Sequence, residues 1–299
     1  MIFILAASTL FLLILAGNGD NSTAAGKGFN TKIVGGEDID IMEAPYQVSV
    51  RLVQRENGKY GSGHICGGVV ITQRLIVSAA HCTFAPKKKG FRRAREYVLI
   101  MGSTFLSKKD TTTLQYNVQM VVNHPSYDHE TYINDITLFF INGYIPWNSE
   151  VTALPLSTRQ YSVGTKCVVS GWGSQETGGS RSNSLQAAEI PIISRAECIR
   201  SYGNIPVTQI CAGYMHGGTD SCQGDSGGPL QCHNTLVGIV SYGGKCAEKD
   251  YPGVYTNVIK YTNWIYRINN SFDYSIYKNG SLQLTVWPTI LAVFILASY

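Results

Sequence analysis

From residue 33 onward the chain is a succession of short runs rich in β-branched and aromatic residues, and this feature constrains its fold most. Clusters of Gly, Pro, Asn and Ser separate the runs at short intervals, and no internal repeat is visible. The pattern is typical of an all-β barrel or sandwich. The clearest runs are Tyr46–Val53, Val69–Ile71, Tyr97–Ile100, Val118–Val122, Ile136–Ile141 and Leu236–Ser241.

One segment near the end departs from the β pattern. Between Thr256 and Asn269, apolar residues recur at spacings of three and four, which fits one face of an α-helix. Thr256 and Asn257 are the candidate caps, because their side-chain oxygens can accept from the first free backbone N–H groups. We therefore expect a C-terminal helix that docks on the β-structure.

Composition narrows the class of protein. Of 299 residues, 44% are hydrophobic and only 15% are charged, which excludes a disordered or coiled-coil chain. The net charge of +4 does not imply a nucleic-acid partner, and we expect none. The eight cysteines fit four disulfides in an exported chain, although spacing alone cannot choose their pairing. A cytosolic zinc protein is the disfavoured alternative, because no CxxC pair with metal-ligand spacing occurs.

The start of the chain indicates export. Residues 2–16 are apolar apart from Ser8 and Thr9, which is shorter than the roughly 20 residues of a membrane span. We interpret residues 1–17 as a signal peptide with an uncertain end, and residues 18–32 as a propeptide. An uncleaved N-terminal anchor is the alternative. The protein is then expected outside the cell.

The strongest chemical signal is Ser226, which glycines flank in the run Gly224–Gly228. Such a serine can lie on a tight turn whose backbone N–H groups point at a substrate carbonyl. A serine hydroxyl needs a neighbouring base to act as a nucleophile. His81, at the end of an apolar run, and Asp135, at the start of an apolar strand, are the candidate partners.

Together these segments resemble the trypsin and chymotrypsin family of serine proteases, in the chain order His, Asp, Ser. The resemblance covers about residues 33–269, which we take as the protease domain. It implies two packed six-stranded antiparallel barrels with a C-terminal helix, a catalytic triad between them and no cofactor. The motifs that carry it are Ile33–Gly36, Ala79–Cys82, Asp135–Ile136, Gly171–Gly173, Asp220–Leu230 and Pro252–Tyr255.

The resemblance also implies roles. Ser226 attacks the scissile carbonyl, His81 takes and returns the proton, and Asp135 holds the imidazole. The backbone N–H groups of Gly224 and Ser226 form the oxyanion hole. The expected activity is that of a serine endopeptidase. A catalytically silent binding module is the disfavoured alternative, since all three triad residues are present.

Asp220 is expected to set the specificity. It lies six residues before Ser226, which matches the base of the trypsin primary pocket. A buried carboxylate needs a cation, and a substrate Lys or Arg supplies one, unless Asp220 pairs internally. The other substrate-binding residues implied by the resemblance are Ser221, Ser241, Gly243 and Gly253. No metal is expected, because Lys108 and Lys109 occupy the loop that binds calcium in some trypsins.

Activation is expected between Lys32 and Ile33, by another protease. The freed ammonium of Ile33 would pair with Asp225, and protease inhibitors are expected partners of the active form. The resemblance implies the disulfides Cys66–Cys82, Cys167–Cys232, Cys198–Cys211 and Cys222–Cys246.

A basic run interrupts the domain without any intervening acid. It is either a solvated surface loop or an exosite for acidic partners such as sulfated glycans. Its members are Lys87, Lys88, Lys89, Arg92, Arg93 and Arg95.

Residues 270–299 form a polar spacer followed by the apolar, uncharged stretch Leu284–Tyr299. This order fits a signal for a glycosylphosphatidylinositol (GPI) anchor at the cell surface. A short spanning tail and a freely secreted enzyme are the alternatives. Three sequons predict glycosylation at Asn21, Asn269 and Asn279.

Overall fold

The computed structural model describes residues 35–56, 58–174 and 176–274. The expected signal peptide, propeptide and apolar tail lie outside these residues. So do Asn21, Lys32, Ile33 and Asn279. The described residues therefore cover nearly all of the expected protease domain.

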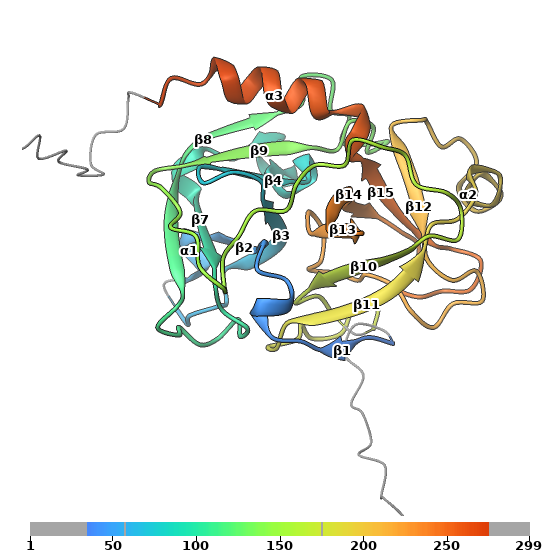
Figure 1. Ribbon diagram of the computed structural model, residues 1–299, viewed down its shortest axis with the longest axis horizontal. Helices are drawn as coiled ribbons and strands as arrows, with labels where there is room; N and C mark the ends of the chain where they lie inside the picture. Colours follow the sequence, from blue (N-terminus) through green and yellow to red (C-terminus); the bar gives the residue numbers. More distant parts are fainter. Residues whose placement is uncertain (1–34, 57, 175, 275–299) are drawn as a thin grey trace, which may run out of the picture. The chain divides into compact units, whose positions relative to one another are not determined.

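The first half of the domain is a closed six-stranded antiparallel barrel, drawn in blue and green in Figure 1. Its strands carry inward-facing apolar residues, and turns rich in Gly and polar residues separate the strands, as the sequence pattern predicts. Each of the six β-rich runs named in the sequence analysis overlaps an observed strand. In spatial order the barrel strands are β2 (Gln47–Leu52), β3 (His64–Val70), β4 (Leu75–Ser78), β9 (Thr137–Ile141), β8 (Leu114–Asn123) and β7 (Tyr97–Met101).

The second half is a seven-stranded antiparallel sheet, drawn mainly in yellow to orange in Figure 1. An isolated antiparallel bridge between Ile192 and Ala212 brings its two far strands, β11 and β12, back together. Six strands therefore curl into the second expected barrel, and β1 adds at its rim. Their order is β1 (Glu37–Asp38), β11 (Gln186–Pro191), β10 (Lys166–Gly171), β13 (Pro229–Cys232), β14 (Thr235–Tyr242), β15 (Gly253–Asn257) and β12 (Gln209–Ala212).

Helices are few: α1 (Val53–Glu56), α2 (Arg195–Tyr202) and α3 (Thr262–Ser271). The C-terminal helix is confirmed, but its predicted start was wrong. Thr256 and Asn257 end strand β15, where the Thr256 hydroxyl donates to the backbone oxygen of Asp135 (2.7 Å) and Asn257 donates to that of Val207 (3.1 Å). These long-range bonds outweigh local helical periodicity, so α3 begins only at residue 262. Among the described residues, no helix is long and apolar enough to cross a membrane.

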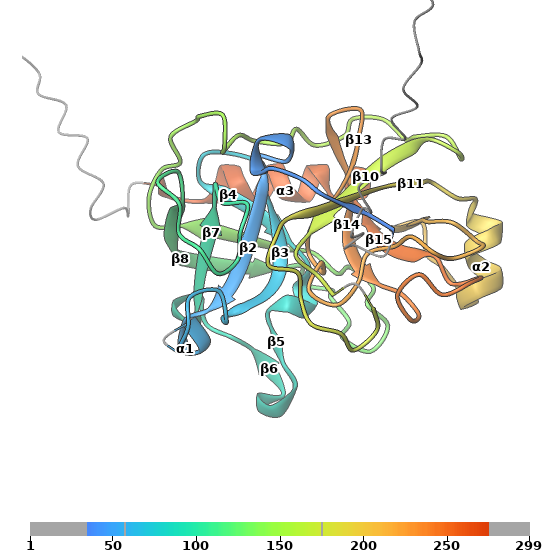
Figure 2. The same cartoon turned by 90° about the horizontal axis from the view of Figure 1, so that it is seen from below.

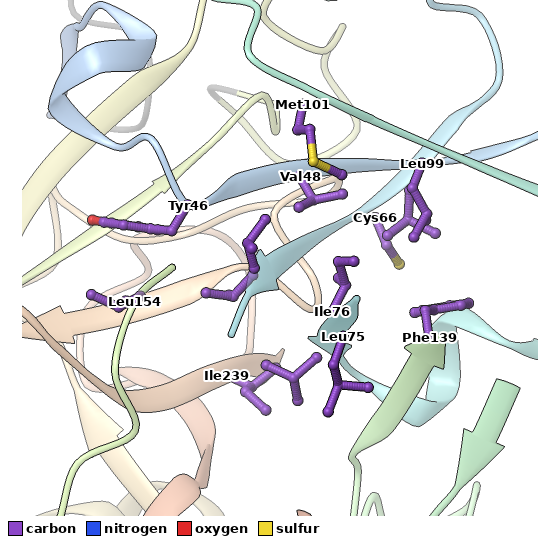
Figure 3. Close-up of a cluster of buried hydrophobic side chains, with 14 of the residues drawn as sticks. Tyr46, Val48, Cys66, Leu75, Ile76, Leu99, Met101, Phe139, Leu154 and Ile239 are labelled. Carbon is purple, nitrogen blue, oxygen red and sulfur yellow. The ribbon is translucent and has the colours of Figure 1, made fainter. Parts of the chain in front are cut away.

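The core of the first barrel extends into the second half, which also has a buried cluster of its own around Val169 and Leu230. Figure 3 shows Val48, Leu75 and Phe139 of the first barrel packed near Ile239 of strand β14. All four side chains are fully buried. Burying a side chain of this size stabilises a fold by about 1.5–3 kcal/mol, so the two halves stabilise one another.

A short hairpin carries much of the basic run. Strand β5 (Phe84–Ala85) pairs with β6 (Gly90–Phe91), and Lys89 takes a left-handed conformation (φ 48°) in the turn between them. Residues 83–96, which we call the basic hairpin, begin directly after the turn that carries His81. Figure 2 shows the hairpin projecting from the first barrel.

Candidate active site

His81 and Asp135 come together at the edge of the first barrel. His81 lies on a short 3₁₀ turn, Ala80–Cys82, and Asp135 lies just before β9. The imidazole Nδ1 is 2.7 Å from Asp135 Oδ2, and the His81 backbone N–H donates to Oδ1 (2.9 Å). Two bonds from one residue fix both the position and the rotation of the ring.

The second half of the domain completes the surroundings of Asp135. The Ser241 hydroxyl, on β14, donates to Asp135 Oδ2 at 2.6 Å. Asp135 is fully buried, so its carboxylate oxygens accept from three protein donors instead of water. Ser241 was expected to bind substrate, and in the structure its side chain also holds the aspartate.

Ser226 lies beside this pair, on the loop before β13. Its backbone oxygen accepts from Gly67 of β3 (2.8 Å). The sulfur of Cys82 lies 3.8 Å from His81 Nε2 and 3.7 Å from the Ser226 backbone oxygen, so both residues border the Cys66–Cys82 disulfide. No hydrogen bond joins Ser226 Oγ to His81 Nε2 within the described residues. Such bonds are often long in unliganded enzymes and shorten with substrate.

Gly224, two residues before Ser226, has a left-handed φ of 107° that only glycine adopts without strain. The N–H groups of Gly224 and Ser226 make no hydrogen bond to any described residue. His64 Nε2 bonds to the Gly224 carbonyl oxygen (3.1 Å). That nitrogen must carry the proton, because a carbonyl only accepts. Nδ1 therefore accepts from the Ser49 hydroxyl (2.8 Å).

His64 is a residue that the sequence analysis does not single out, because no recognisable motif flanks it. It is fully buried, and burial lowers its pKa to about 3. The ring therefore stays neutral and ties the loop of Gly224 to strands β2 and β3. Tyr132 was also missed: its ring meets that of His81 edge to face, with centroids 5.6 Å apart.

A pocket of about 180 Å³ adjoins Ser226. All the expected substrate-binding residues line it: Asp220, Ser221, Ser241, Gly243 and Gly253.

Asp220 is 4% exposed within this pocket, and its Oδ1 accepts from the Ser221 N–H (2.8 Å). Burial raises the pKa of Asp220 to about 7, although hydrogen bonds from the backbone N–H groups of Ser221 and Ala247 lower it in part. No Lys or Arg lines the pocket, and no ion pair to Asp220 occurs among the described residues. The Asp220 carboxylate therefore has no cationic partner among the described residues.

Asp225 is fully buried next to the catalytic loop. Its oxygens accept from the N–H groups of Gly173 (2.8 Å) and Cys222 (2.9 Å). Burial nevertheless raises its pKa to about 6. Its expected partner, Ile33, lies outside the described residues.

All eight cysteines form the four disulfides that the resemblance implied: Cys66–Cys82, Cys167–Cys232, Cys198–Cys211 and Cys222–Cys246. The first anchors the His81 turn to β3, and the last joins two walls of the pocket. Cys66, His81 and Cys82 lie close together, but sulfurs in a disulfide offer no thiolate to a metal.

Comparison with known proteins places this geometry in a family. The family model described as Trypsin matches residues 33–265. Human "Serine protease 1" is 38% identical over 236 residues, and chicken (Gallus gallus) "Trypsin I-P1" is 40% identical over the same length. Both alignments cover 78% of this chain and 88% of the relative. "Trypsin" of Simulium vittatum is 42% identical over 231 residues, which is 76% of this chain and 88% of the relative.

The matched region contains every part of the site described above. It also has the trypsin-like fold expected from the sequence. The chain therefore belongs to the trypsin family and is a serine endopeptidase that acts on protein substrates.

Proposed function

We propose that this endopeptidase is made as an extracellular zymogen and cleaves peptide bonds after Lys or Arg. The observation that carries the specificity is Asp220, a buried carboxylate without a cation at the pocket beside Ser226. A substrate ammonium or guanidinium would supply the missing charge, and burial makes an unpaired charge costly. The alternative, an internal ion pair of Asp220, is not supported, because Asp220 has no cationic partner among the described residues.

Catalysis in this proposal uses Ser226, His81 and Asp135. The Ser226 hydroxyl attacks the scissile carbonyl while His81 Nε2 takes its proton, and the imidazolium then donates that proton to the leaving amine. Asp135 keeps the proton on Nδ1, because both of its oxygens already accept from His81. Nε2 is therefore the free base.

The oxyanion hole is formed by the N–H groups of Gly224 and Ser226. Two donors without partners in the described part of the chain can stabilise the tetrahedral intermediate without first breaking bonds. The His64 bond to the Gly224 carbonyl oxygen restrains the backbone between these two N–H groups.

Activation by cleavage between Lys32 and Ile33 would supply Asp225 with a charge partner. Gly35 packs against Gly218 and Thr219: a Cβ added to it would lie 2.6 Å from the Gly218 oxygen. Two residues span at most about 7 Å, so the new N-terminus would start beside the loop that carries Asp220 and Asp225. An ammonium there would favour the ionised form of Asp225 over the protonated one.

Two measurements test these proposals. The activated enzyme is profiled on short fluorogenic peptides that differ only at the residue before the cleaved bond, and hydrolysis confined to Lys and Arg is expected. Lys32→Gln should remain inactive after treatment with a trypsin-like activator, while the unaltered zymogen gains activity. Full activity of Lys32→Gln after the same treatment would refute the activation site.

An extracellular location is supported by the four disulfides, which persist in oxidising compartments. We further propose a GPI anchor, with the apolar tail of residues 284–299 as its signal. Of the three predicted glycosylation sites, Asn269 is the one within the described residues; it lies in the last turn of α3, and its Oδ1 accepts from the Tyr274 hydroxyl (2.5 Å). Phosphatidylinositol-specific phospholipase should release activity from cells that express the full chain. Resistant surface activity, or activity already in the medium, would refute the anchor.

A further inference from the structure

Cations line two grooves of the domain, one of which reaches the loop that carries Ser226 at Gln223. Under the proposed function, the edge Ser241–Gly243 of β14 binds the substrate before the cleaved bond. The chain after that bond then leaves past Cys82 and β3, because Gly67 of β3 holds the Ser226 backbone on that side. Two grooves line this exit.

The first, which we call the exit groove, has a volume of about 530 Å³ and begins at Gln223, next to Gly224. Its charged lining residues are Lys59 and Arg181, with no acid. Arg181 lies close to the expected oxyanion hole, since a Cβ added to Gly224 would be 3.5 Å from Arg181 Cδ. The hydroxyl of Tyr60, in the same lining, is buried without a hydrogen-bond partner among the described residues.

Arg181 has no anionic partner in the described part of the chain. The side chain is only partly buried, and this partial burial, and next the repulsion of Arg55, lower its pKa. An arginine in this setting is stabilised by a carboxylate that arrives with a ligand.

The second, which we call the hairpin groove, has a volume of about 440 Å³ and lies between α1 and the basic hairpin. Arg55, Lys87, Lys88 and Arg92 line it, together with one acid, Glu96. Glu96 is already neutralised by Lys88 (3.1 Å). The groove therefore carries a surplus of positive charge.

The loop between the grooves is held in place before any substrate arrives. Arg51 is buried and pairs with Glu56 at 2.6 Å. The same carboxylate accepts from the N–H groups of Gly61 (2.6 Å) and Gly63 (2.8 Å). Since Glu56 is thereby neutralised and holds Gly61 and Gly63, Arg55 and Lys59 are presented at little entropic cost.

We propose that the two grooves form an exosite for an acidic segment of the substrate, located C-terminal to the cleaved bond. This inference rests on the proposed cleavage after Lys or Arg. A peptide is favoured over a sulfated glycan because Gln223 lines both the primary pocket and the exit groove, so one polypeptide can pass from the pocket into that groove. Charges placed along such a path raise the association rate and fix the register of the substrate.

The test uses two peptides with the same four residues up to the cleaved Arg. One carries Asp and Glu at the second to fifth positions after the bond, and the other carries Asn and Gln. For the activated full-length enzyme at low ionic strength, kcat/KM should be about tenfold higher for the acidic peptide. The ratio should fall toward one at roughly 0.5 M salt, where charges on the surface are screened.

A variant and a matched control locate the effect. Neutralising the grooves should reduce the ratio to about one or two, and neutralising four exposed cations elsewhere should leave it unchanged. The groove variant is Arg55→Gln, Lys59→Gln, Lys87→Gln and Arg181→Gln. The control variant is Arg159→Gln, Lys166→Gln, Arg200→Gln and Lys260→Gln.

Each result is read within one enzyme, as a ratio, so a general change in activity does not affect it. Cleavage of a short fluorogenic Arg substrate that has no residues after the bond tests the proposed function separately. If that substrate is cleaved but the peptide ratio is near one, the exosite is refuted and the proposed function stands. Retention on a heparin column that only the groove variant loses, together with a ratio near one, would assign the surface to a glycan and overturn the proposal.

Discussion

The replacement Asp220→Ser probes the specificity proposal most directly. It removes the carboxylate and leaves a small hydroxyl in a pocket that contains no other charge. The guanidinium of a bound Arg would then be buried without a partner. Ser226, His81 and Asp135 make no hydrogen bond to Asp220, so their arrangement should persist.

The size of the effect can be worked out from burial. Asp220 is 4% exposed, so its pairing with a substrate cation takes place out of water. Removing one partner of a buried ion pair costs about 3–5 kcal/mol. At about 1.36 kcal/mol per factor of ten, kcat/KM for Arg and Lys substrates should fall by about 10²- to 10⁴-fold.

The assay compares kcat/KM on an Arg peptide with the rate at which a small phosphonylating probe modifies Ser226. It is run at about pH 8, above the pKa of about 7 for Asp220, so that the unaltered enzyme is mostly ionised. The probe rate should change by less than about threefold, since the probe does not need the carboxylate.

Ser221→Ala is the matched control, because it removes a hydroxyl 3.4 Å from Asp220 but keeps the charge. Its loss should stay within about tenfold, as expected for one hydrogen bond. Strong cleavage after Arg by Asp220→Ser would refute the reasoning. If the probe rate also collapses, Asp220→Asn, which keeps the shape, replaces it in the same comparison.

The geometry of the site makes four further predictions. Asp135→Asn must turn its NH₂ toward a donor of His81, so kcat should fall by about 10⁴-fold, a magnitude taken over from the family's established triad. Benzamidine should bind about tenfold more weakly per pH unit below about 7, with proton release on binding in calorimetry, because the empty Asp220 holds a proton there. The same raised pKa means that the empty enzyme loses stability as pH rises from about 4 to about 7, a slope that benzamidine should reduce. Gly253→Ala, whose Cβ would lie 2.8 Å from Asp220 Oδ1, should weaken benzamidine more than Gly243→Ala, whose nearest neighbours are 3.9 Å away; equal effects would contradict the pocket geometry.

The parts of the site that the sequence predicted are those carried by short motifs. Ser226 and its neighbours lie in one continuous run, so their chemistry is visible without knowledge of the fold. The strands were also predictable, because β-branched runs between Gly and Pro clusters have few alternatives. The all-β class was confirmed for this reason, and the C-terminal helix because its apolar residues recur at spacings of three and four.

The parts that sequence reasoning missed depend on contacts between distant segments. His64 reaches a residue 160 positions away, and no local pattern marks a histidine as the partner of a carbonyl. Thr256 was interpreted as a helix cap because its hydroxyl suits that position, yet a bond to Asp135, 121 positions away, holds it in a strand. Arg51 reads as an outward-facing strand residue, but it is 1% exposed because Glu56 folds back over it.

Helix α3 comes after the last strand of the second sheet but packs against the first barrel, as the upper part of Figure 1 shows. Trp264 lies 5.1 Å from the ring of His124, and Phe272 stacks on Phe140 with centroids 4.0 Å apart. During synthesis, therefore, the first barrel emerges from the ribosome more than a hundred residues before the segment that covers its flank.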